Sequence, residues 1–357
     1  MVYFRLYPQH SSIPFFHSGS INRLSLITMC FGEVVEFSRR LNMTKTFKPI
    51  DLSRVKTYPL SERKSRVTTS DFAKTWQKGS YFKEFLDSLP DVLAGADIKT
   101  VISSIVAAFE NKKTIVLGMG AHVIKVGLNP VVIDLMERRI ITAVAMNGAG
   151  IIHDSELAMA GQTSEDVAAS IGNGSFGMAH ETNSFLSDAI RKAGDHSSGL
   201  GESIGLAMIE EDLPFLDQSI LVAGARLGIP VTVHVAFGTD IIHMHPGFDP
   251  NAAGAATHRD FRTFASVIAT LEEGVYLNVG SAVILPEVFL KAVTLVRNLG
   301  HNLDSFTTVN MDFIKHYRPV TNVVNRSTAR GGQGFNLTGH HEIMLPLIAA
   351  GVIEEIG

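Results

Sequence analysis

The sequence predicts an α/β fold: a doubly wound, mostly parallel β-sheet with flanking helices. Two observations lead to this prediction. Five short apolar runs each end in glycine or a small polar residue, and a helical segment follows each run along the chain. This alternation is what a parallel sheet with right-handed crossovers requires. Five clear runs fall short of an eight-stranded barrel, which favours an open sheet.

Three parts of the chain differ in composition. Residues 1–42 lack the pattern of a secretory signal, and we expect a poorly structured extension there, with a transit segment as the alternative. Residues 43–112 are interpreted as a mainly helical or irregular arm that packs on the core. Apolar spacing predicts its helices over Phe72–Leu89 and Ile98–Glu110. Residues 113–357 are expected to form the α/β domain.

The strands of this domain are predicted from β-branched apolar runs. The first, Thr114–Gly118, closes on glycine and has the composition of a buried parallel strand. The others are Ile140–Met146, Ile229–Phe237, Val275–Val279 and Phe306–Met311. Since ligands of such sheets bind beyond the carboxyl ends of the strands, the residues that follow each strand are candidates for a site.

Helical spacing fills the segments between the strands. Asn129 and Pro130 are interpreted as the N-cap and first residue of a helix that continues over Val131–Arg139. A long helical stretch separates the second and third strands, and we interpret it as an insertion or cap. Its predicted segments are Glu156–Ala160, Ser164–Ser170, Asn183–Lys192, Glu202–Glu211 and Leu216–Leu227, the last closed by Gly228. The later helices are Arg259–Glu273, Pro286–Leu299 and Glu342–Ala349.

The composition excludes several classes of protein. The 31 basic and 35 acidic residues give a net charge of −4, which argues against nucleic-acid binding. Cys30 is the only cysteine, so an intrachain disulfide and a cysteine-based zinc site are ruled out, as suits a cytoplasmic protein. No apolar run reaches the roughly 18 to 20 residues of a membrane span. The low charged fraction, 18%, favours a homo-oligomer that buries surface.

Glycines at the ends of strands suggest a cofactor site. Gly118 and Gly120, with Ala121 after them, stand where a backbone approaches a pyrophosphate closely. The fingerprint is incomplete, because the third glycine is replaced by Val123 and the next strand ends in Asn147 instead of an acid. Similar small residues end three further strands, at Asn147-Gly148, Phe237-Gly238 and Gly280-Ser281. This recurrence favours a nucleotide or cofactor site over plain strand-to-helix turns.

Histidines and acids cluster after the third predicted strand, in the run from Asp240 to His243 and His245. In an extended segment alternate residues face the same way, so both histidines are candidates to hold one metal or one substrate. Two further pairs, His153-Asp154 and His340-His341, add possible ligands. Because the sequence does not show three ligands converging, we assign no metal and keep a polar histidine cluster as the alternative.

Two further segments carry charge near a strand end. Arg326 and Arg330 flank the glycine-rich run Gly331-Gly332-Gln333-Gly334, which suits either an anionic ligand or a mobile surface loop. Lys315 follows the last predicted strand closely, where an amine with a lowered pKa could form a Schiff base, although most lysines are simply solvated.

The order of these motifs resembles the deoxyhypusine synthase family, which has a tetrameric, NAD-dependent, Rossmann-like fold. The run from Thr114 to Ile124 is similar to that family's first strand and NAD-contacting turn. The run from Ala143 to Asp154 is similar to its second strand, and Gly228-Ile-Pro-Val231 with Thr239–His243 to its third. Val279-Gly-Ser281 stands in place of its triple-glycine turn, and Val309-Asn-Met-Asp312 in place of its last strand end.

The departures from the family concern its chemistry. Its paired glutamates after the second strand are replaced by Ile152 and His153, with Asp154 retained. Its active-site lysine has no counterpart, since the equivalent stretch is Gly339-His340-His341-Glu342. The resemblance therefore implies the fold and NAD but not the reaction through a lysine imine.

Together these features give a leading hypothesis of a divergent NAD-dependent enzyme, transferase- or oxidoreductase-like, acting on a small, possibly cationic, amino or polyamine-like substrate. Asp240 would orient the substrate and His243, His245 or His340 would act as general base. The residues expected to bind NAD are Gly118, Gly120, Ala121, Asn147, Gly148, Asp154, Gly280, Ser281, Asn310 and Asp312. The alternatives are a metal-dependent hydrolase or lyase using His243 and His245, and a non-enzymatic cofactor-binding protein.

Overall fold

The computed structural model describes residues 47–196 and 198–356, so the expected extension over 1–42 lies outside the described residues. The chain divides into two compact units, Met1–Ser65 and Arg66–Gly357. In the first unit the described segment, residues 47–65, contains the short 3-10 helix η1 (Leu60–Glu62) and is exposed along its length. The helices before the sheet therefore belong to the same unit as the sheet.

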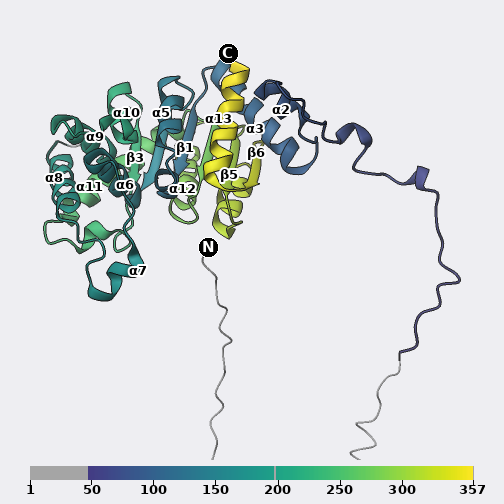
Figure 1. The fold of residues 1–357 in the computed structure, drawn as a ribbon, viewed down its shortest axis with the longest axis horizontal. Coiled ribbons are helices and arrows are strands. Elements are labelled where there is room, and N and C mark those ends of the chain that lie inside the picture. Colours follow the sequence, from purple (N-terminus) through teal and green to yellow (C-terminus); the bar gives the residue numbers. More distant parts are fainter. Residues whose placement is uncertain (1–46, 197, 357) are drawn as a thin grey trace, which may run out of the picture. The chain divides into compact units, whose positions relative to one another are not determined.

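A six-stranded, entirely parallel sheet forms the centre of the second unit (Figure 1). Its strands are β1 (Ile115–Met119), β2 (Ala143–Asn147), β3 (Val231–His234), β4 (Val275–Val279), β5 (Thr307–Asp312) and β6 (Gln333–Thr338). They are ordered β3-β2-β1-β4-β5-β6 across the sheet. This is the strand order of a Rossmann-type doubly wound sheet, whose winding reverses between β1 and β4. The predicted α/β fold class is confirmed.

β6 is the strand that the sequence did not reveal. It begins inside the glycine-rich run that was interpreted as a loop, at Gln333, and it pairs with β5 along its whole length, from Thr307 opposite Gln333 to Asp312 opposite Thr338. The π-helix η6 (Pro319–Arg326) precedes it. Arg330 pairs with Asp304 at 2.9 Å. The predicted anion-binding loop is therefore partly a strand, and one of its arginines is already paired.

The two faces of the sheet bury different sets of helices. One face packs against α3 (Leu93–Glu110), α5 (Asn129–Glu137), α6 (Gly148–Ala160) and α13 (His341–Ile356). The other face packs against α11 (Pro250–Ile268), α12 (Ile284–Asn298) and η6, around the buried aromatic residues Phe264, Tyr276 and Phe289. β1 to β5 are buried on both faces, which is why β1 and β2 are apolar over almost their whole length and lack alternation. β6, at the edge of the sheet, is exposed at both ends.

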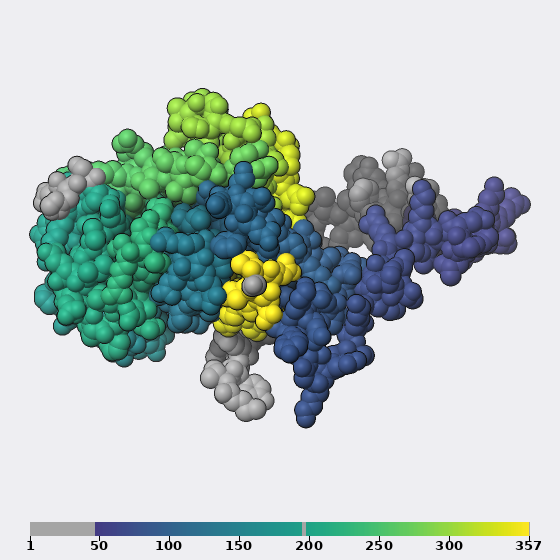
Figure 2. Space-filling view, turned by 90° about the horizontal axis from the view of Figure 1, so that it is seen from above, coloured from purple at the N-terminus to yellow at the C-terminus, as the bar shows by residue number. Residues whose placement is uncertain are grey.

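The two predicted helices before the sheet differ in length from those observed: the first is shorter, and the second, α3, starts at Leu93 instead of Ile98. The expected helix over Phe72–Leu89 is α2 (Phe82–Ser88) alone, because Gly79 adopts a φ of +90° and ends any regular helix there. The 3-10 helix η2 (Thr69–Asp71) lies before it. α2 and α3 pack against α13, which Figure 2 shows in yellow beside the blue N-terminal segment.

The predicted insertion between β2 and β3 is helical and packs beside β3. It contains α7 (Val167–Ser170), η3 (Ile171–Asn173), α8 (His180–His196), α9 (Leu200–Glu210), η4 (Leu216–Gln218) and α10 (Ile220–Leu227). α11 closes the exposed edge of β3 through side chains: Thr257 bonds both to the Val235 amide, at 3.1 Å, and to the Val233 carbonyl, at 2.8 Å. Covering the free edge of the sheet in this way protects it from pairing with another chain.

In the described ranges no helix is both long and apolar enough to span a bilayer.

Candidate functional site

The candidate site lies at the carboxyl edge of the sheet, where the turns after β1, β2, β4 and β5 and the segments after β3 and β6 meet. We call this region the carboxyl edge. The turn after β1 leads into the short helix α4 (His122–Lys125), and the segment after β3 contains the 3-10 helix η5 (Ile241–Met244). Most of the residues predicted from the sequence lie here, but several of them have a structural partner that the sequence did not reveal.

The switch point between β1 and β4 is closed by two glycines in direct contact. The Gly120 amide donates to the Val279 carbonyl at 2.9 Å, and a Cβ at Gly120 would collide with the Gly280 carbonyl. Gly280 itself has a φ of +67°, a left-handed conformation that favours glycine. The two turns therefore present a surface of main chain, with Ala121 and Ser281 beside it, at the point where this strand order places a dinucleotide.

Gly118 is not part of this surface, which corrects the prediction that it contacts a cofactor. It lies inside β1 and is buried, and a Cβ there would collide with the phenol of Tyr276. The Tyr276 ring stacks on Phe289 with centroids 3.8 Å apart. The glycine is needed for packing between β1 and β4.

Asp154 does not lie at the carboxyl edge, although it was predicted to bind a cofactor. It lies in the second turn of α6 and is fully buried. It accepts hydrogen bonds from the Asn129 amide at 2.9 Å, from the Ser219 hydroxyl at 2.5 Å, and from the Ile220 and Leu221 amides at 3.0 and 3.1 Å. Burial raises the pKa of Asp154, and these four donors oppose that shift. The carboxylate caps the first turn of α10 and has no room for a cofactor.

Asn310 and Ser281 have internal partners as well. Asn278, Asn310 and Asn336 face one another across β4, β5 and β6, and their amides form two hydrogen bonds of 2.8 Å each. Ser281 accepts from the Leu285 amide at 3.1 Å and fixes the start of α12. Asn310 is thus a structural residue of the sheet, while Ser281 keeps its position beside the switch point.

The turn after β2 brings Gly148 and Asp240 together. Asn147 caps α6 by accepting from the Gly150 amide at 3.2 Å, and the Asp240 carboxylate lies against Gly148 in the first turn of that helix. Asp240 is 8% exposed, and its Oδ2 atom has no hydrogen-bond partner among the described residues. Burial raises the pKa of Asp240, although nearby His243 opposes the rise. An unsatisfied buried carboxylate oxygen is costly unless a cation or donor completes it.

His243 and His245 do not face the same way. His243 lies on η5 and His245 follows it, so the extended geometry that would align them is absent. Nδ1 of His243 accepts from the Gly238 and Asp240 amides at 3.2 and 3.3 Å, and Nδ1 of His245 accepts from the Gly247 amide at 3.3 Å. Each neutral ring therefore carries its proton on Nε2 and acts there as a donor. In the described part of the chain, Nε2 of His243 is buried without a partner.

A shared metal site on these histidines has no geometric support. Within residues 47–196 and 198–356 no three histidine, cysteine or carboxylate side chains come close enough to hold a metal ion. His153, an expected additional ligand, instead bonds through Nδ1 to the Thr163 hydroxyl at 2.7 Å.

A second polar group surrounds Asp312 at the end of β5. Asp312 is 4% exposed, and its Oδ1 accepts from the Phe313 amide at 2.8 Å. Nε2 of His341 lies 3.7 Å from Oδ1, and Nε2 of His316 lies 3.8 Å from Oδ2. Asp312 was predicted, whereas His316 was not, and His341 was noted only as a possible metal ligand. Asp312 therefore takes part in the site through a pair of imidazoles.

His340 is the more exposed of the two neighbouring histidines. Its side chain is 69% exposed, and its ring stacks on Phe313 with centroids 6.3 Å apart. His341, the next residue, is 1% exposed and points into the carboxyl edge. The sequence prediction named His340 and not His341 as a general base, and it started the last helix at Glu342, one residue after α13 begins. The start of that helix is the signal that distinguishes the two histidines.

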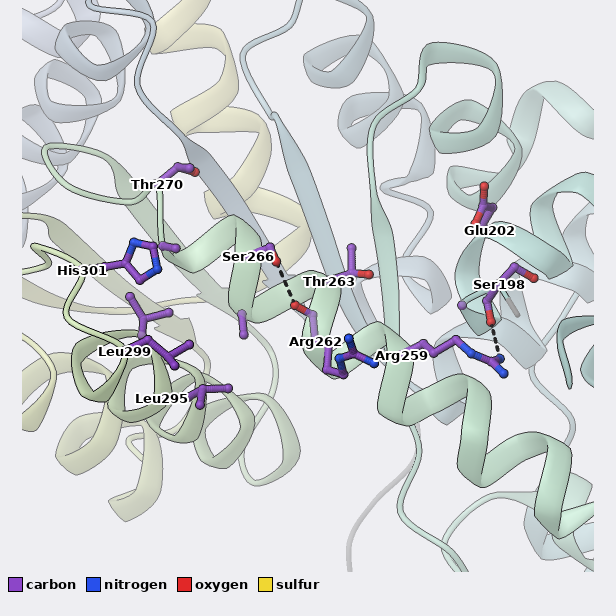
Figure 3. Close-up of a pocket in the computed structure, with 14 residues that line it drawn as sticks. Ser198, Glu202, Arg259, Arg262, Thr263, Ser266, Thr270, Leu295, Leu299 and His301 are labelled. Atoms are coloured by element: carbon purple, nitrogen blue, oxygen red, sulfur yellow. Dashed lines mark hydrogen bonds between the residues drawn. The ribbon is translucent and has the colours of Figure 1, made fainter. Parts of the chain in front are cut away.

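A groove in the described part of the chain lies away from the carboxyl edge. It has a volume of about 790 Å³ and runs between α9, α11 and α12 (Figure 3). Arg259 extends across it to donate to the Ser198 carbonyl at 2.9 Å, and Arg262 and His301 lie farther along its wall. The ends of α11 and α12 that line it lead into the amino ends of β4 and β5. It contains none of the predicted site residues.

Comparisons with known proteins find the fold but no family. No protein-family model and no curated protein matches the chain. Similar solved structures include AgrE in complex with ornithine and NAD⁺ (TM-score 0.49, 14% identity, 73% of this chain and 33% of that one). They also include apo ArgZ, a cyanobacterial arginine dihydrolase (TM-score 0.46, 14% identity, 73% and 31%). A third is a provisionally assigned deoxyhypusine synthase from Entamoeba histolytica (TM-score 0.43, 14% identity, 79% and 96%).

The chain spans about a third of the length of AgrE and ArgZ. At 14% identity these likenesses concern the arrangement of the backbone alone, and they carry no statement about the chemistry of this chain.

Proposed function

We propose that this protein binds NAD across the carboxyl ends of β1 and β4 and acts as an NAD-dependent enzyme on a small amino or polyamine-like substrate. The observation that carries the proposal is the strand order β3-β2-β1-β4-β5-β6, whose winding reverses between β1 and β4. Sheets of this order bind dinucleotides at that point. The reaction differs from the lysine-imine route of deoxyhypusine synthases, because the residue run Gly339–Glu342 supplies no lysine.

The residues at the switch point fit a dinucleotide in part. The turns after β1 and β4 meet at Gly120 and Gly280, where the space over the two glycines is filled by the Gly280 carbonyl and the His341 ring. A pyrophosphate would therefore bind main-chain amides next to these glycines, including those in the first turn of α6 after Asn147. The ribose is the weaker part of the fit, because β2 ends in Asn147 where an acid is usual; its amide would have to serve instead. Bound NAD would supply the hydride acceptor of the reaction.

Asp240 and His243 support an amino substrate. Asp240 presents a buried carboxylate oxygen without a partner in the described chain, and His243 presents a buried Nε2–H donor, also unpartnered there. They lie at either end of one short turn. An ammonium group satisfies the first atom, and a carbonyl, carboxylate or amine lone pair satisfies the second. Asp240 would hold and orient the substrate, while His243 would fix its second polar group.

The exposed apolar side chains of the carboxyl edge support a homo-oligomer, which we propose to be a tetramer. Phe237, Met244, Val283, Phe313 and Tyr317 are 45% to 75% exposed and all follow strand ends or line η5. Apolar rings gathered around a polar site are typical of surfaces that a partner or ligand covers. Light scattering after size-exclusion chromatography measures the mass; a monomer at all concentrations would contradict this part of the proposal.

NAD binding tests the proposal directly. Isothermal titration of the purified protein with NAD should give saturable binding, and NAD should raise the melting temperature. Absence of both at millimolar NAD would overturn the proposal. Spermidine, ornithine and arginine are then tested with NAD for NADH formation at 340 nm. Binding without turnover on any amine would favour the non-enzymatic alternative.

Asp240→Asn tests the substrate site separately. It should leave the Kd for NAD within about twofold and abolish any thermal shift produced by the amine, since a neutral amide no longer pairs with an ammonium. Asp134→Asn is the matched control, because Asp134 is a half-exposed carboxylate paired with Arg138 at 2.9 Å. An amine response that survives Asp240→Asn would remove Asp240 from the site.

A further inference from the structure

The His341 ring at the start of α13 is buried, and its two ring nitrogens lack regular hydrogen bonds. The residue is 1% exposed, and neither Nδ1 nor Nε2 makes a hydrogen bond of regular geometry in the described ranges, although the Met311 carbonyl lies close enough to act on the ring. An imidazole used only to fill a core normally satisfies at least one nitrogen, because an unsatisfied buried polar atom costs about 1–3 kcal/mol. The free nitrogens therefore call for a functional explanation.

His341 lies directly on the turn at the switch point. A Cβ at Gly280 would be 2.9 Å from Cε1 of His341, so the left-handed glycine leaves the space that the ring occupies. Gly280 in turn touches Gly120 at the end of β1. A molecule bound over the ends of β1 and β4 would thus lie within about one side-chain length of this imidazole.

The cover over the ring is thin. His122 and Phe313 pack edge-on against His341, with ring centroids 5.3 and 5.8 Å away. His122 is itself exposed, and Phe313 is 46% exposed. Both covering rings are exposed, and exposed side chains change rotamer in picoseconds to nanoseconds.

Asp312 fixes which nitrogen of the His341 ring carries the proton in its neutral form. Asp312, buried at the end of β5, places Oδ1 3.7 Å from Nε2 of His341. A carboxylate on one side of an imidazole holds a proton on the nitrogen that faces it and leaves the other nitrogen as an acceptor. Here Nε2 faces Asp312, so Nδ1 is the acceptor. The 3.7 Å separation is longer than a hydrogen bond, as is common for catalytic pairs without ligand.

We propose that His341 is the proton acceptor of this site, that Asp312 orients it and stabilises the imidazolium, and that Phe313 and His122 gate access to it. The inference rests on the proposed function, because removal of hydride from an amine carbon requires an uncharged nitrogen. The N–H bond of the substrate ammonium breaks, its electron pair stays on nitrogen, and the proton binds Nδ1 of His341.

Several groups set the proton affinity of His341. Burial lowers its pKa most, Asp312 raises it, His122 lowers it, and the Met311 carbonyl and Glu342 raise it. The net direction is downward, which keeps the ring uncharged and able to accept a proton near neutral pH. His316 faces the other oxygen of Asp312 at 3.8 Å and competes for the same carboxylate.

The coupling of His341 to Asp312 is measured without NAD or substrate. The full chain is labelled with ¹³C,¹⁵N-histidine and titrated by NMR. Asp312→Asn should lower the proton affinity of His341 about tenfold or more, whereas Asp304→Asn, which removes an exposed acid paired with Arg330, should not change it. An unchanged His341 titration in Asp312→Asn would overturn the dyad. This result does not depend on whether NAD binds.

The gate is measured by chemical modification. Diethylpyrocarbonate acylates accessible neutral imidazole, and mass spectrometry follows the product at His341. Phe313→Ala should raise the rate about tenfold or more over the native chain, while Ile314→Ala, a neighbouring exposed residue, should leave it unchanged. Equal rates in all three proteins would overturn the gate.

The catalytic role is measured on whichever amine gives NADH with the native protein. His341→Gln should lower kcat about 10²-fold or more and leave the Kd for NAD within about twofold. Full turnover in His341→Gln would overturn the role as proton acceptor. Failure of the native protein to bind NAD would instead overturn the proposed function, and the titration of Asp312→Asn would still decide the dyad.

Discussion

The phenol of Tyr276 lies over Gly118, in the space that any larger residue at position 118 would need. The Tyr276 ring is fully buried and stacks on Phe289 at an interplanar angle of 1°. A glycine in a strand interior often marks close approach of another group, and here that group is a neighbouring side chain instead of a cofactor. The first glycine of the apparent fingerprint is thus explained by packing between β1 and β4.

Gly118→Ala should destabilise the protein by about 1–3 kcal/mol, because an added methyl forces the stacked rings apart in a close-packed core. Urea unfolding followed by circular dichroism gives the change in free energy. Gly172→Ala is the matched control, since nothing lies within 4 Å of a Cβ there. A Gly118→Ala protein of native stability that binds NAD more weakly would instead return Gly118 to the cofactor site.

Tyr276→Phe should leave the free energy of unfolding unchanged or raise it by about 1 kcal/mol. The Tyr276 hydroxyl is buried with no partner among the described residues, so its removal takes away an unsatisfied polar atom and keeps the stacked ring. Burial also raises the pKa of Tyr276, so the hydroxyl is never ionised in the folded protein. A loss of more than about 1 kcal/mol would mean that an internal water satisfies this hydroxyl.

Strands rich in β-branched residues could be predicted from the sequence, whereas β6, which is poor in them, could not. Thr114–Gly118 and Val275–Val279 correspond closely to β1 and β4. β6 contains Gly334, Asn336 and a single bulky aliphatic residue, Leu337, so its local preference for a strand is weak. It is a strand because β5 offers a free edge with which it can pair over six residues. Such long-range pairing leaves no local pattern in the sequence.

In the candidate site, too, features set by the local sequence could be predicted, and features set by distant contacts could not. That Asp240 and Asp312 lie at the carboxyl edge followed from the alternation of strands and helices. The role of Asp154 as a cap of α10 could not be predicted from the sequence, because its partners Ser219 and Ile220 are more than 60 residues away. The choice between His340 and His341 depends on where α13 begins, and one residue there changes a side chain from exposed to buried.

Asp154→Ala should destabilise the protein by about 3 kcal/mol and leave NAD affinity per folded molecule unchanged. The substitution leaves the Ser219 hydroxyl and the Ile220 and Leu221 amides buried without an acceptor, and each such group carries a desolvation cost. Urea unfolding measures the loss, and Asp134→Ala, at a half-exposed acid, should change stability by less than about 1 kcal/mol. Native stability in Asp154→Ala with weaker NAD binding would support the original cofactor role.

His234 should make the protein sensitive to acid. Burial lowers the pKa of His234 from 6.5 to about 3, and it lowers that of His153 to about 4. A ring with a depressed folded pKa contributes stability that is complete above pH 6.5 and is lost as the pH falls toward 3, because the unfolded chain takes up the proton first. His234→Gln should flatten the decline in unfolding free energy between pH 6 and about 4. An unchanged decline would show that His234 takes up a proton in the folded protein as readily as in the unfolded chain.

Asp260 should have the opposite effect. Its carboxylate accepts from the Gly201 and Val233 amides at 3.1 and 2.9 Å, yet burial raises its pKa from 3.8 to about 7. The folded protein then keeps a proton that the unfolded chain has lost. This contribution is complete below pH 3.8 and disappears as the pH rises to about 7.

Urea unfolding between pH 4 and 8 measures the effect of Asp260. In the native protein we expect the unfolding free energy contributed by Asp260 to fall as the pH rises. Asp260→Asn should remove this fall, because an amide does not ionise. Asp134→Asn should leave the fall unchanged. The native protein and Asp260→Asn would show the same slope only if Asp260 were ionised when folded. In that case the backbone donors at the edge of β3 and the start of α9 would outweigh the cost of burying the charge, and Asp260→Asn would weaken the cover of that edge at every pH.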